Sequence, residues 1–202
     1  MYPVKYSADY VEKRSRLSTF FRSLLAIPLL LAAFFWGIAA YACVVIAWFA
    51  LLFTGRYPQG LYDFNAKAIR FLQRTSAYFY LLTDEYPSFG GDHDPNYPVR
   101  IEFAPPAAHY SRLKTFFRYV LAIPVFIMQY LYSIVAGFVV ILSWVVIVVT
   151  GKQPRGLQDL LKMAMSYNAK ATAYLFLLTE QYPPITDKAQ LEGAEPTPQL
   201  GI

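Results

Sequence analysis

The sequence predicts a mainly α-helical integral membrane protein made of two tandem repeats. Nearly the same segments recur 96 residues apart, so that Arg16-Leu17 returns as Arg112-Leu113. Each copy also contains a run of 33 residues without a charged side chain, 23–55 in the first and 119–151 in the second. About 20 apolar residues suffice to cross a bilayer, and self-similarity at a fixed period marks a repeated structural unit. We therefore expect the repeated unit to be a membrane unit.

Each repeat is expected to contain a short β-strand, an interfacial helix, a long transmembrane helix and a second amphipathic helix packed back in a hairpin. We place a first membrane repeat at residues 1–90, a linker at 91–96, a second membrane repeat at 97–184 and a polar, disordered tail at 185–202. The repeat-defining structural positions are Arg22, Pro28, Trp48, Gly55, Pro58 and Gly60, which return as Arg118, Pro124, Trp144, Gly151, Pro154 and Gly156.

Composition supports a membrane location and argues against nucleic acid as a partner. The chain is 56% hydrophobic and 18% aromatic, with a net charge of +5. Its Lys and Arg residues flank the apolar segments, where they would anchor the chain and meet anionic lipid. No basic patch lies apart from these segments, so we expect no nucleic-acid binding. The single cysteine, Cys43, has no internal disulfide partner and is interpreted as a packing residue.

Each copy opens with a segment that alternates like a half-buried strand. Residues 97–103 place Val99, Ile101 and Phe103 on one face, and residues 2–7 form a weaker counterpart. We expect these strands to pair with each other or with another chain. An amphipathic stretch follows in both copies, and its apolar side chains at helical spacing predict a helix along the membrane surface: Leu17, Phe20, Phe21 and Leu24, then Leu113, Phe116, Phe117 and Val120.

Pro28 and Pro124 are expected in the first turn of the long helices, where proline is well tolerated. A helix over residues 28–53 would be about 39 Å long, which a tilted spanning helix accommodates; a re-entrant hairpin is the alternative. Both long helices should end at a shared turn, T-G-[RK]-x-P-x-G-L, because glycine just after a helix and proline soon afterwards stop it.

A second helix is predicted at about 60–83 and again at about 156–179, and each carries a stripe of charges. Charges at membrane depth are costly and mark packing or functional sites. The stripes are therefore candidate lipid- or partner-contact sites. If the helices span, the stripes should face inward and pair across the repeats; if they lie in the interface, the stripes should face water. The residues are Asp63, Lys67, Arg70 and Arg74 in the first copy and Asp159, Lys162 and Lys170 in the second.

The sequence offers little support for catalysis. Asp63 and Asp159 could form a general acid and base across the repeats, but an acidic residue in the first turns of a helix has a structural explanation. Asp92-His93-Asp94 could bind a metal, but its Gly/Pro-rich surroundings favour a turn. No common catalytic or nucleotide-binding motif is present. We therefore predict no catalytic residue, no cofactor and no metal site.

The order of these elements resembles a bacterial family of small membrane proteins, the domain of unknown function 4389 family. The residues that carry the resemblance are Tyr2 and Tyr97 at the strand starts, Arg16-Leu17 with Phe20-Phe21-Arg22, Ala26-Ile27-Pro28, Trp48, Thr54 to Pro58 with Gly60, and Leu81 to Pro87. The second copy departs at Gln153, where the first has Tyr57, and at Pro105 to Ala108. The resemblance implies the fold and a membrane location but no reaction.

From these observations we expect a non-catalytic accessory or scaffold protein located in the bacterial cytoplasmic (inner) membrane. We expect it to associate with a larger membrane complex or with itself, and to contact anionic membrane lipids. The alternatives are a lipid-binding or lipid-transport protein of the cell envelope and a membrane enzyme acting on lipids. Because the two copies begin with nearly identical segments, we expect both to start on the same side of the membrane, which favours a second helix that spans. If the second helix stays in the interface, the copies would be inverted instead.

Overall fold

The computed structural model, which describes residues 2–185, has the predicted mainly helical fold of two repeats. The first repeat contains β1 (Val4–Ala8), α1 (Arg16–Phe20), α2 (Arg22–Leu25), α3 (Ile27–Thr54) and α4 (Gln59–Phe79). The second contains β2 (Val99–Phe103), α5 (Arg112–Phe116), α6 (Arg118–Leu121), α7 (Ile123–Thr150) and α8 (Arg155–Leu175). Apart from residue 185, the predicted tail lies outside the described residues.

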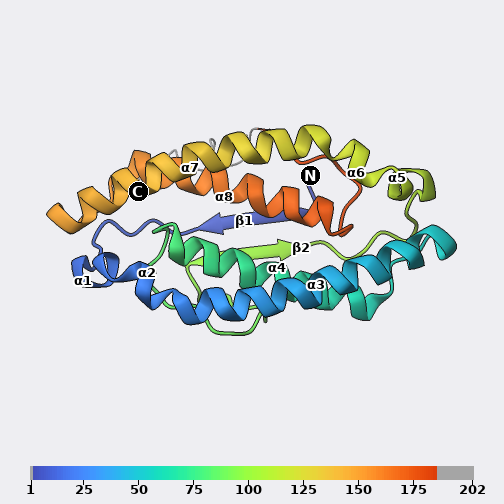
Figure 1. Cartoon of the computed structure of the whole chain (residues 1–202), viewed down its shortest axis with the longest axis horizontal. Coiled ribbons are helices and arrows are strands. Elements are labelled where there is room, and N and C mark those ends of the chain that lie inside the picture. The colour runs from blue at the N-terminus through green and yellow to red at the C-terminus, as the bar shows by residue number, and fades with distance from the viewer. Residues whose placement is uncertain (1, 186–202) are drawn as a thin grey trace, which may run out of the picture.

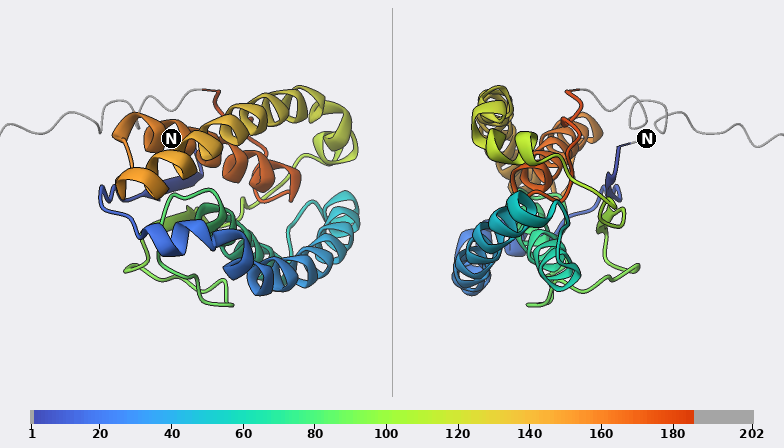
Figure 2. Two further views of the ribbon diagram at one scale, coloured as in Figure 1. Left: turned by 60° about the vertical axis from the view of Figure 1, so that its left-hand side comes forward. Right: turned by 90° about the vertical axis from the view of Figure 1, so that its right-hand side faces the viewer.

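The elements form three layers, and an approximate twofold axis relates the two repeats. The long helices α3 and α7 run in opposite directions along the molecule and form one outer layer (Figure 1). The amphipathic helices α4 and α8 form the middle layer, and the strands lie on the far side of them (Figure 2). A half-turn about the viewing direction of Figure 1 exchanges the two repeats, because it exchanges α3 with α7 and α1 with α5.

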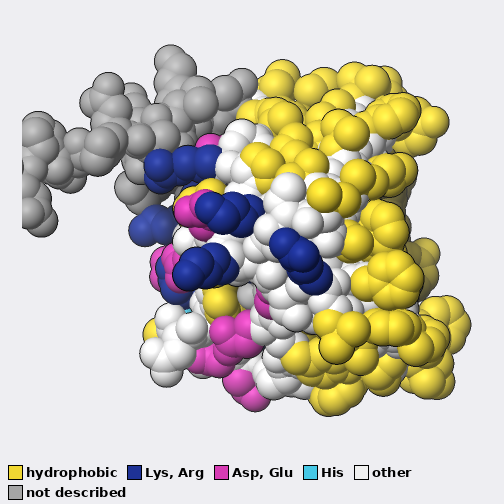
Figure 3. Space-filling view, turned by 90° about the vertical axis from the view of Figure 1, so that its left-hand side faces the viewer, with side chains coloured by type: hydrophobic (Ala, Val, Ile, Leu, Met, Phe, Trp, Pro, Cys, Tyr) yellow, Lys and Arg dark blue, Asp and Glu magenta, His cyan; other side chains and the backbone are white. Residues whose placement is uncertain are grey.

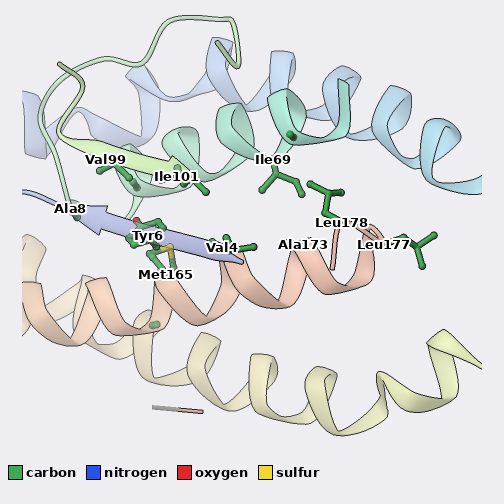
Figure 4. Packing of buried hydrophobic residues seen from close by; sticks show 14 of the residues in the cluster. Val4, Tyr6, Ala8, Ile69, Val99, Ile101, Met165, Ala173, Leu177 and Leu178 are labelled. Atoms are coloured by element: carbon green, nitrogen blue, oxygen red, sulfur yellow. The ribbon is translucent and has the colours of Figure 1, made fainter. Parts of the chain in front are cut away.

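The two strands pair with each other, which was one of the two predicted alternatives. β1 and β2 are antiparallel, with Lys5 opposite Glu102 and Tyr6 opposite Ile101. The alternation of the sequence places Tyr6 and Ile101 on the face that packs against α8 and α4 (Figure 4). It places the polar residues on the other face. The core therefore extends from the sheet through the middle layer, which contributes Met165 and Ile69, to the inner sides of the long helices, where Val44 and Ala136 lie.

The long helices begin and end where the sequence predicts. Proline lies in the first turn of both α3 and α7. Gly55 and Gly151 follow the last turns with φ of 68° and 72°, a left-handed conformation that glycine adopts without steric cost. Each helix packs on its neighbour through one narrow stripe at helical spacing, which in α3 is Leu29, Ala40, Val44, Ala47 and Leu51.

The second helices are shorter than predicted: α4 ends at Phe79 and α8 at Leu175, rather than near 83 and 179. Leu81 and Leu177 adopt positive φ values of 64° and 65°, which reverse the chain. The leucine side chains are buried after this reversal, and burial of a large apolar side chain offsets the cost of a left-handed residue. Apolar residues continue at helical spacing past this reversal, so the sequence pattern does not predict where the helices end.

The opening segment of each repeat docks on the other repeat. The Arg14 backbone N–H donates to the Gly151 carbonyl at 2.9 Å, and the Tyr110 N–H donates to the Gly55 carbonyl at the same distance. The two repeat-defining tryptophans complete the docking, because Trp48 Nε1 donates to the α5 backbone at 2.9 Å and Trp144 Nε1 to the α1 backbone at 3.1 Å. The shared turn after each long helix is therefore the docking point for the other repeat.

This exchange places the two opening segments at opposite ends of the molecule, with α1 near the end of α7 and α5 near the end of α3 (Figure 1). If the long helices span a membrane, the repeats must be inverted relative to each other. This is the arrangement expected for second helices that do not span, and not the one in which both copies start on the same side. Near-identical opening sequences do not determine the direction in which each copy is inserted. Each opening segment docks on the other copy, so the same contacts form when the two copies are inverted.

Candidate interaction surfaces

One side of the molecule, formed by the outward surfaces of α1–α3 and α5–α7, exposes almost only apolar side chains; we call it the apolar face. Within the described residues, α3 and α7 are the two helices long and apolar enough to cross a membrane. Only 17% of the most apolar stretch of α3 and 22% of that of α7 is buried in the protein. A core helix of a soluble protein would be mostly buried, so these helices present their apolar surface outward.

The short helices extend the apolar face at both ends. Leu17 and Phe20 on α1, and Leu113 and Phe116 on α5, are exposed as the predicted amphipathic spacing requires. The polar Thr19 and Thr115 lie on the buried side of the same helices. The short helices thus direct their apolar side chains away from the protein, in the same way as α3 and α7.

The opposite side is charged, and we call it the polar face. It contains the outer surface of the sheet, where Lys5, Arg100 and Glu102 project, together with the linker and the outer edges of α4 and α8. Arg100 forms an ion pair with Asp9, at 2.6 Å between Nη2 and Oδ1. Viewed along the long helices, hydrophobic side chains occupy one half of the molecule and charged side chains gather on the other half (Figure 3).

The two arginines of the first stripe hold the sheet and the linker in place. Arg70 Nε donates to the Ile101 carbonyl of β2 at 3.1 Å, and its guanidinium lies 5.2 Å from the Phe103 ring centroid. Arg74 donates to the Asp92 carbonyl at 2.9 Å. Burial is the main cause that lowers the pKa of both arginines from the ordinary value, although arginine remains charged at neutral pH.

The remaining residues of the first stripe are exposed. Lys67 Nζ lies 2.7 Å from Asp92 Oδ1, and this contact holds the pKa of Asp92 below its usual value. Asp63 accepts a hydrogen bond from Gln59, one turn earlier on the same helix, at 2.9 Å. Arg70 and Arg74 thus have structural contacts, whereas Lys67 and Asp63 remain accessible from solvent.

The second stripe is divided in the same way. Asp159 is exposed and Lys162 is half-buried, whereas Lys170 is buried with its ammonium 5.8 Å from the ring centroid of Tyr2, just before β1. Both stripes therefore begin at the surface and end beneath the strands. Among residues 2–185, no ion pair joins Asp63 or Asp159 to a cation of the other repeat.

An open cleft of about 590 Å³ lies on the polar face between α4 and the end of β2. Lys67 and Arg70 contribute cations to it, Asp63 an anion, and Phe103 and Pro105 apolar surface. The prolines belong to the segment Pro105 to Ala108, where the second copy departs from the first. The lining can contact an anionic group and a small apolar group together.

The repeat-defining arginines close each repeat from within. Arg22 Nη1 donates to the backbone carbonyls of Tyr78 and Thr83 at 2.8 and 2.6 Å, and Nη2 forms an ion pair with Asp84. Arg118 donates to the Thr179 carbonyl at 3.1 Å. Each guanidinium also lies over a tyrosine ring, at 4.3 Å in the first repeat and 4.2 Å in the second. These arginines fix the irregular chain that follows α4 and α8.

A polar cluster around Arg14 was not predicted from the sequence. Its Nη2 donates to the Leu82 carbonyl at 2.7 Å and to Gln158 Oε1 at 3.1 Å, and burial is the main cause that lowers its pKa. The equivalent residues of the other repeat are Tyr110 and Tyr62, so the cluster is aromatic there. The two copies differ in chemistry at these positions, and this difference was the one sign of the cluster in the sequence.

The geometry gives no support to the catalytic and metal alternatives. Asp63 and Asp159 lie near the starts of α4 and α8, which run in opposite directions, so the two carboxylates are at opposite ends of the middle layer (Figure 1). Among residues 2–185, no group of three or more His, Cys, Asp or Glu side chains is arranged to hold a metal ion, and this includes the Asp92-His93-Asp94 segment.

The model of one protein family, described as domain of unknown function (DUF4389), matches the chain twice, at residues 16–90 and 112–186. The chain belongs to the DUF4389 family. Both matches start at α1 or α5 and include the long helix, the shared turn and the second helix, so each DUF4389 unit corresponds to one repeat without its strand. No curated protein and no solved structure matches the chain.

Membership of the DUF4389 family assigns no activity to the stripes, the cleft or the apolar face. It does locate them within the repeat. The two stripes and the shared turns belong to the DUF4389 units, whereas the sheet and most of the segment that precedes each unit lie outside the matched residues. The polar face thus contains residues of the matched family units and residues outside them.

Proposed function

We infer that this DUF4389 protein is a non-catalytic accessory or scaffold protein of a membrane, the bacterial inner membrane, and that it associates with a larger complex. The observation that supports this most directly is the division of the molecule into an apolar face and a polar face. The apolar face supplies contact with lipid, since an exposed apolar surface of this extent needs a partner. The polar face leaves the outer surface of the sheet and the cleft available to a protein.

The contacts of the charged stripes support a binding role over a catalytic one. Arg70 and Arg74 donate to backbone carbonyls of β2 and the linker, which gives both arginines a structural role. The ionisable groups that remain accessible, Asp63 and Lys67, carry charges suited to a polar interface.

The experiment is purification of tagged protein from gently solubilised native membranes, followed by identification of everything that accompanies it. A stoichiometric protein partner supports the accessory role, whereas a protein that runs alone overturns it. The double variant Lys5→Glu with Glu102→Lys exchanges the two charges of a directly opposed pair, so the sheet is retained while the polar face changes. We expect this variant to lose the partner. The control, Lys114→Glu, changes an exposed charge on α5 and should retain it.

Lipid binding is a second candidate, and the cleft between α4 and β2 favours it, because cations stand beside apolar residues there. Lys67 is the residue to change, since its side chain is 48% exposed and its ion pair is with Asp92 of the linker. Purified protein should carry an anionic lipid detectable by mass spectrometry, and Lys67→Gln should lose it. Arg70→Gln would be uninformative, since it also removes a bond to β2.

A further inference from the structure

The apolar and polar faces lie on opposite sides of α3 and α7, rather than at their ends. A helix that crosses a bilayer meets water at its two ends and lipid around its sides. Here the charged half of the molecule runs alongside the long helices, behind α4 and α8 (Figures 2 and 3). The direction that separates apolar from polar surface is therefore perpendicular to the long helices.

If α3 and α7 crossed the membrane, the sheet would lie near the bilayer midplane, because β1 and β2 lie midway along the long helices (Figure 1). The outer surface of this sheet carries Lys5, Arg100 and Glu102. Charged side chains are costly at this depth. Within residues 2–185 the sheet has two strands, so each strand has one edge without a strand partner, and open sheet edges do not occur facing lipid.

The approximate twofold axis gives the same orientation. It runs along the viewing direction of Figure 1 and so passes through the apolar face at a right angle. The two repeats therefore offer equivalent surfaces to a single plane: α3 with α1 and α2, and α7 with α5 and α6. A flat bilayer surface is a partner that both repeats can contact equally.

Cations border this surface. Arg16 lies at the end of α7, where its Nε is 3.0 Å from the position that a Cβ on Gly151 would occupy, and Arg112 lies beside Gly55 at the end of α3. Both arginines are exposed. Basic residues beside an exposed apolar surface fit the headgroups of anionic lipids.

We propose that this protein lies in a single leaflet, with α3 and α7 parallel to the bilayer plane, the apolar face in the lipid and the polar face in water. A helix about 10 Å wide fits within one leaflet of a hydrocarbon core about 30 Å thick. The inference rests on the membrane location in the proposed function and adds an orientation to it. The outer surface of the sheet, the cleft and the exposed residues of the stripes all face one aqueous compartment.

The test uses two equivalent positions, Arg56 after α3 and Lys152 after α7, which are exposed and lie at opposite ends of the molecule. In a full-length Cys43→Ala background, single cysteines replace Arg56, Lys152 or, on the sheet, Lys5. Sealed membrane vesicles are treated with a membrane-impermeant maleimide before and after permeabilisation. The parent without cysteine is the labelling control.

In a single leaflet, Arg56→Cys, Lys152→Cys and Lys5→Cys should all react from the same side and to the same extent. Spanning helices place the first two on opposite sides, so that one reacts only after permeabilisation; this result overturns the inference. If Lys5→Cys reacts neither before nor after permeabilisation, a second copy covers the sheet. This result also overturns the inference, because the sheet would not face water. A chain found in the soluble fraction overturns the proposed membrane location as well, which separates the two failures.

Discussion

Replacement of Arg22 by methionine tests the role assigned to the repeat-defining arginines. Arg22 is 2% exposed, and its guanidinium donates to two buried carbonyls and pairs with Asp84. Methionine fills much of the same volume but donates no hydrogen bond. Each lost bond from a charged donor costs about 1.5–3 kcal/mol, so loss of the two bonds to carbonyls alone should lower the free energy of unfolding by about 4 kcal/mol.

The equivalent variant Arg118→Met is the matched comparison. Arg118 is also buried, but it donates to a single backbone carbonyl, at 3.1 Å. One lost bond of this kind corresponds to about 2 kcal/mol. At about 2–4 °C per kcal/mol for a chain of this length, thermal unfolding should shift by about 8–16 °C in Arg22→Met and by about 4–8 °C in Arg118→Met.

The assay is thermal unfolding in detergent, followed by far-ultraviolet circular dichroism, with both variants and the parent in the same buffer. The expected difference between the variants comes from the number of carbonyls that each guanidinium satisfies. Equal shifts in the two variants, or a larger shift in Arg118→Met, would refute it. Arg22→Lys should lie between the parent and Arg22→Met, because an ammonium retains the charge but lacks the planar fork that reaches both carbonyls.

Four further predictions follow from particular contacts. Gly91→Ala should cost about 1–3 kcal/mol of stability, because its methyl would lie 1.8 Å from a backbone oxygen of α4; Gly90→Ala, whose methyl would meet nothing closer than 3.5 Å, should unfold like the parent. Trp48→Phe removes a bond to the α5 backbone, so amide exchange in α5 should accelerate about fivefold, for a loss of about 1 kcal/mol, while exchange in α1 stays unchanged. Burial raises the pKa of Tyr62 to about 12, against about 10 in an unfolded chain. The stabilisation is thus complete below pH 10 and is lost as the pH rises towards 12; Tyr62→Phe should show a shallower fall of melting temperature over this window. Residues 1–95 and 96–202, expressed together as separate chains, should copurify, because each opening segment docks on the other repeat; halves that purify as independent monomers would contradict the exchange.

The local elements could be predicted from the sequence because their signals are local. Proline in the first turn and glycine after the last turn bound the long helices, as Pro28 and Gly55 illustrate. Alternation of apolar and polar residues predicts the strand that contains Ile101. The ends of α4 and α8 could not be predicted, because Leu81 adopts a positive φ only where its side chain finds a buried site.

The candidate sites were predicted in part. The stripe residues do share a side of each helix, but their different roles depend on what lies above them. Arg70 is opposite a carbonyl of β2, whereas Lys67 is next to the linker and remains exposed. The Arg14 cluster was missed altogether, since Gln158, its partner, is 144 residues away in the chain.

The sequence by itself determined the duplication, the order of elements, the family and the two long apolar helices, because each depends on spacing along the chain. Only the tertiary structure decided that each repeat begins on the other, that the sheet lies alongside the long helices, and that apolar and polar surfaces are separated across the molecule. These features arise from contacts between residues far apart in the chain, such as Trp144 with α1, and hydrophobic periodicity shows which face of a helix is apolar but not what lies behind it.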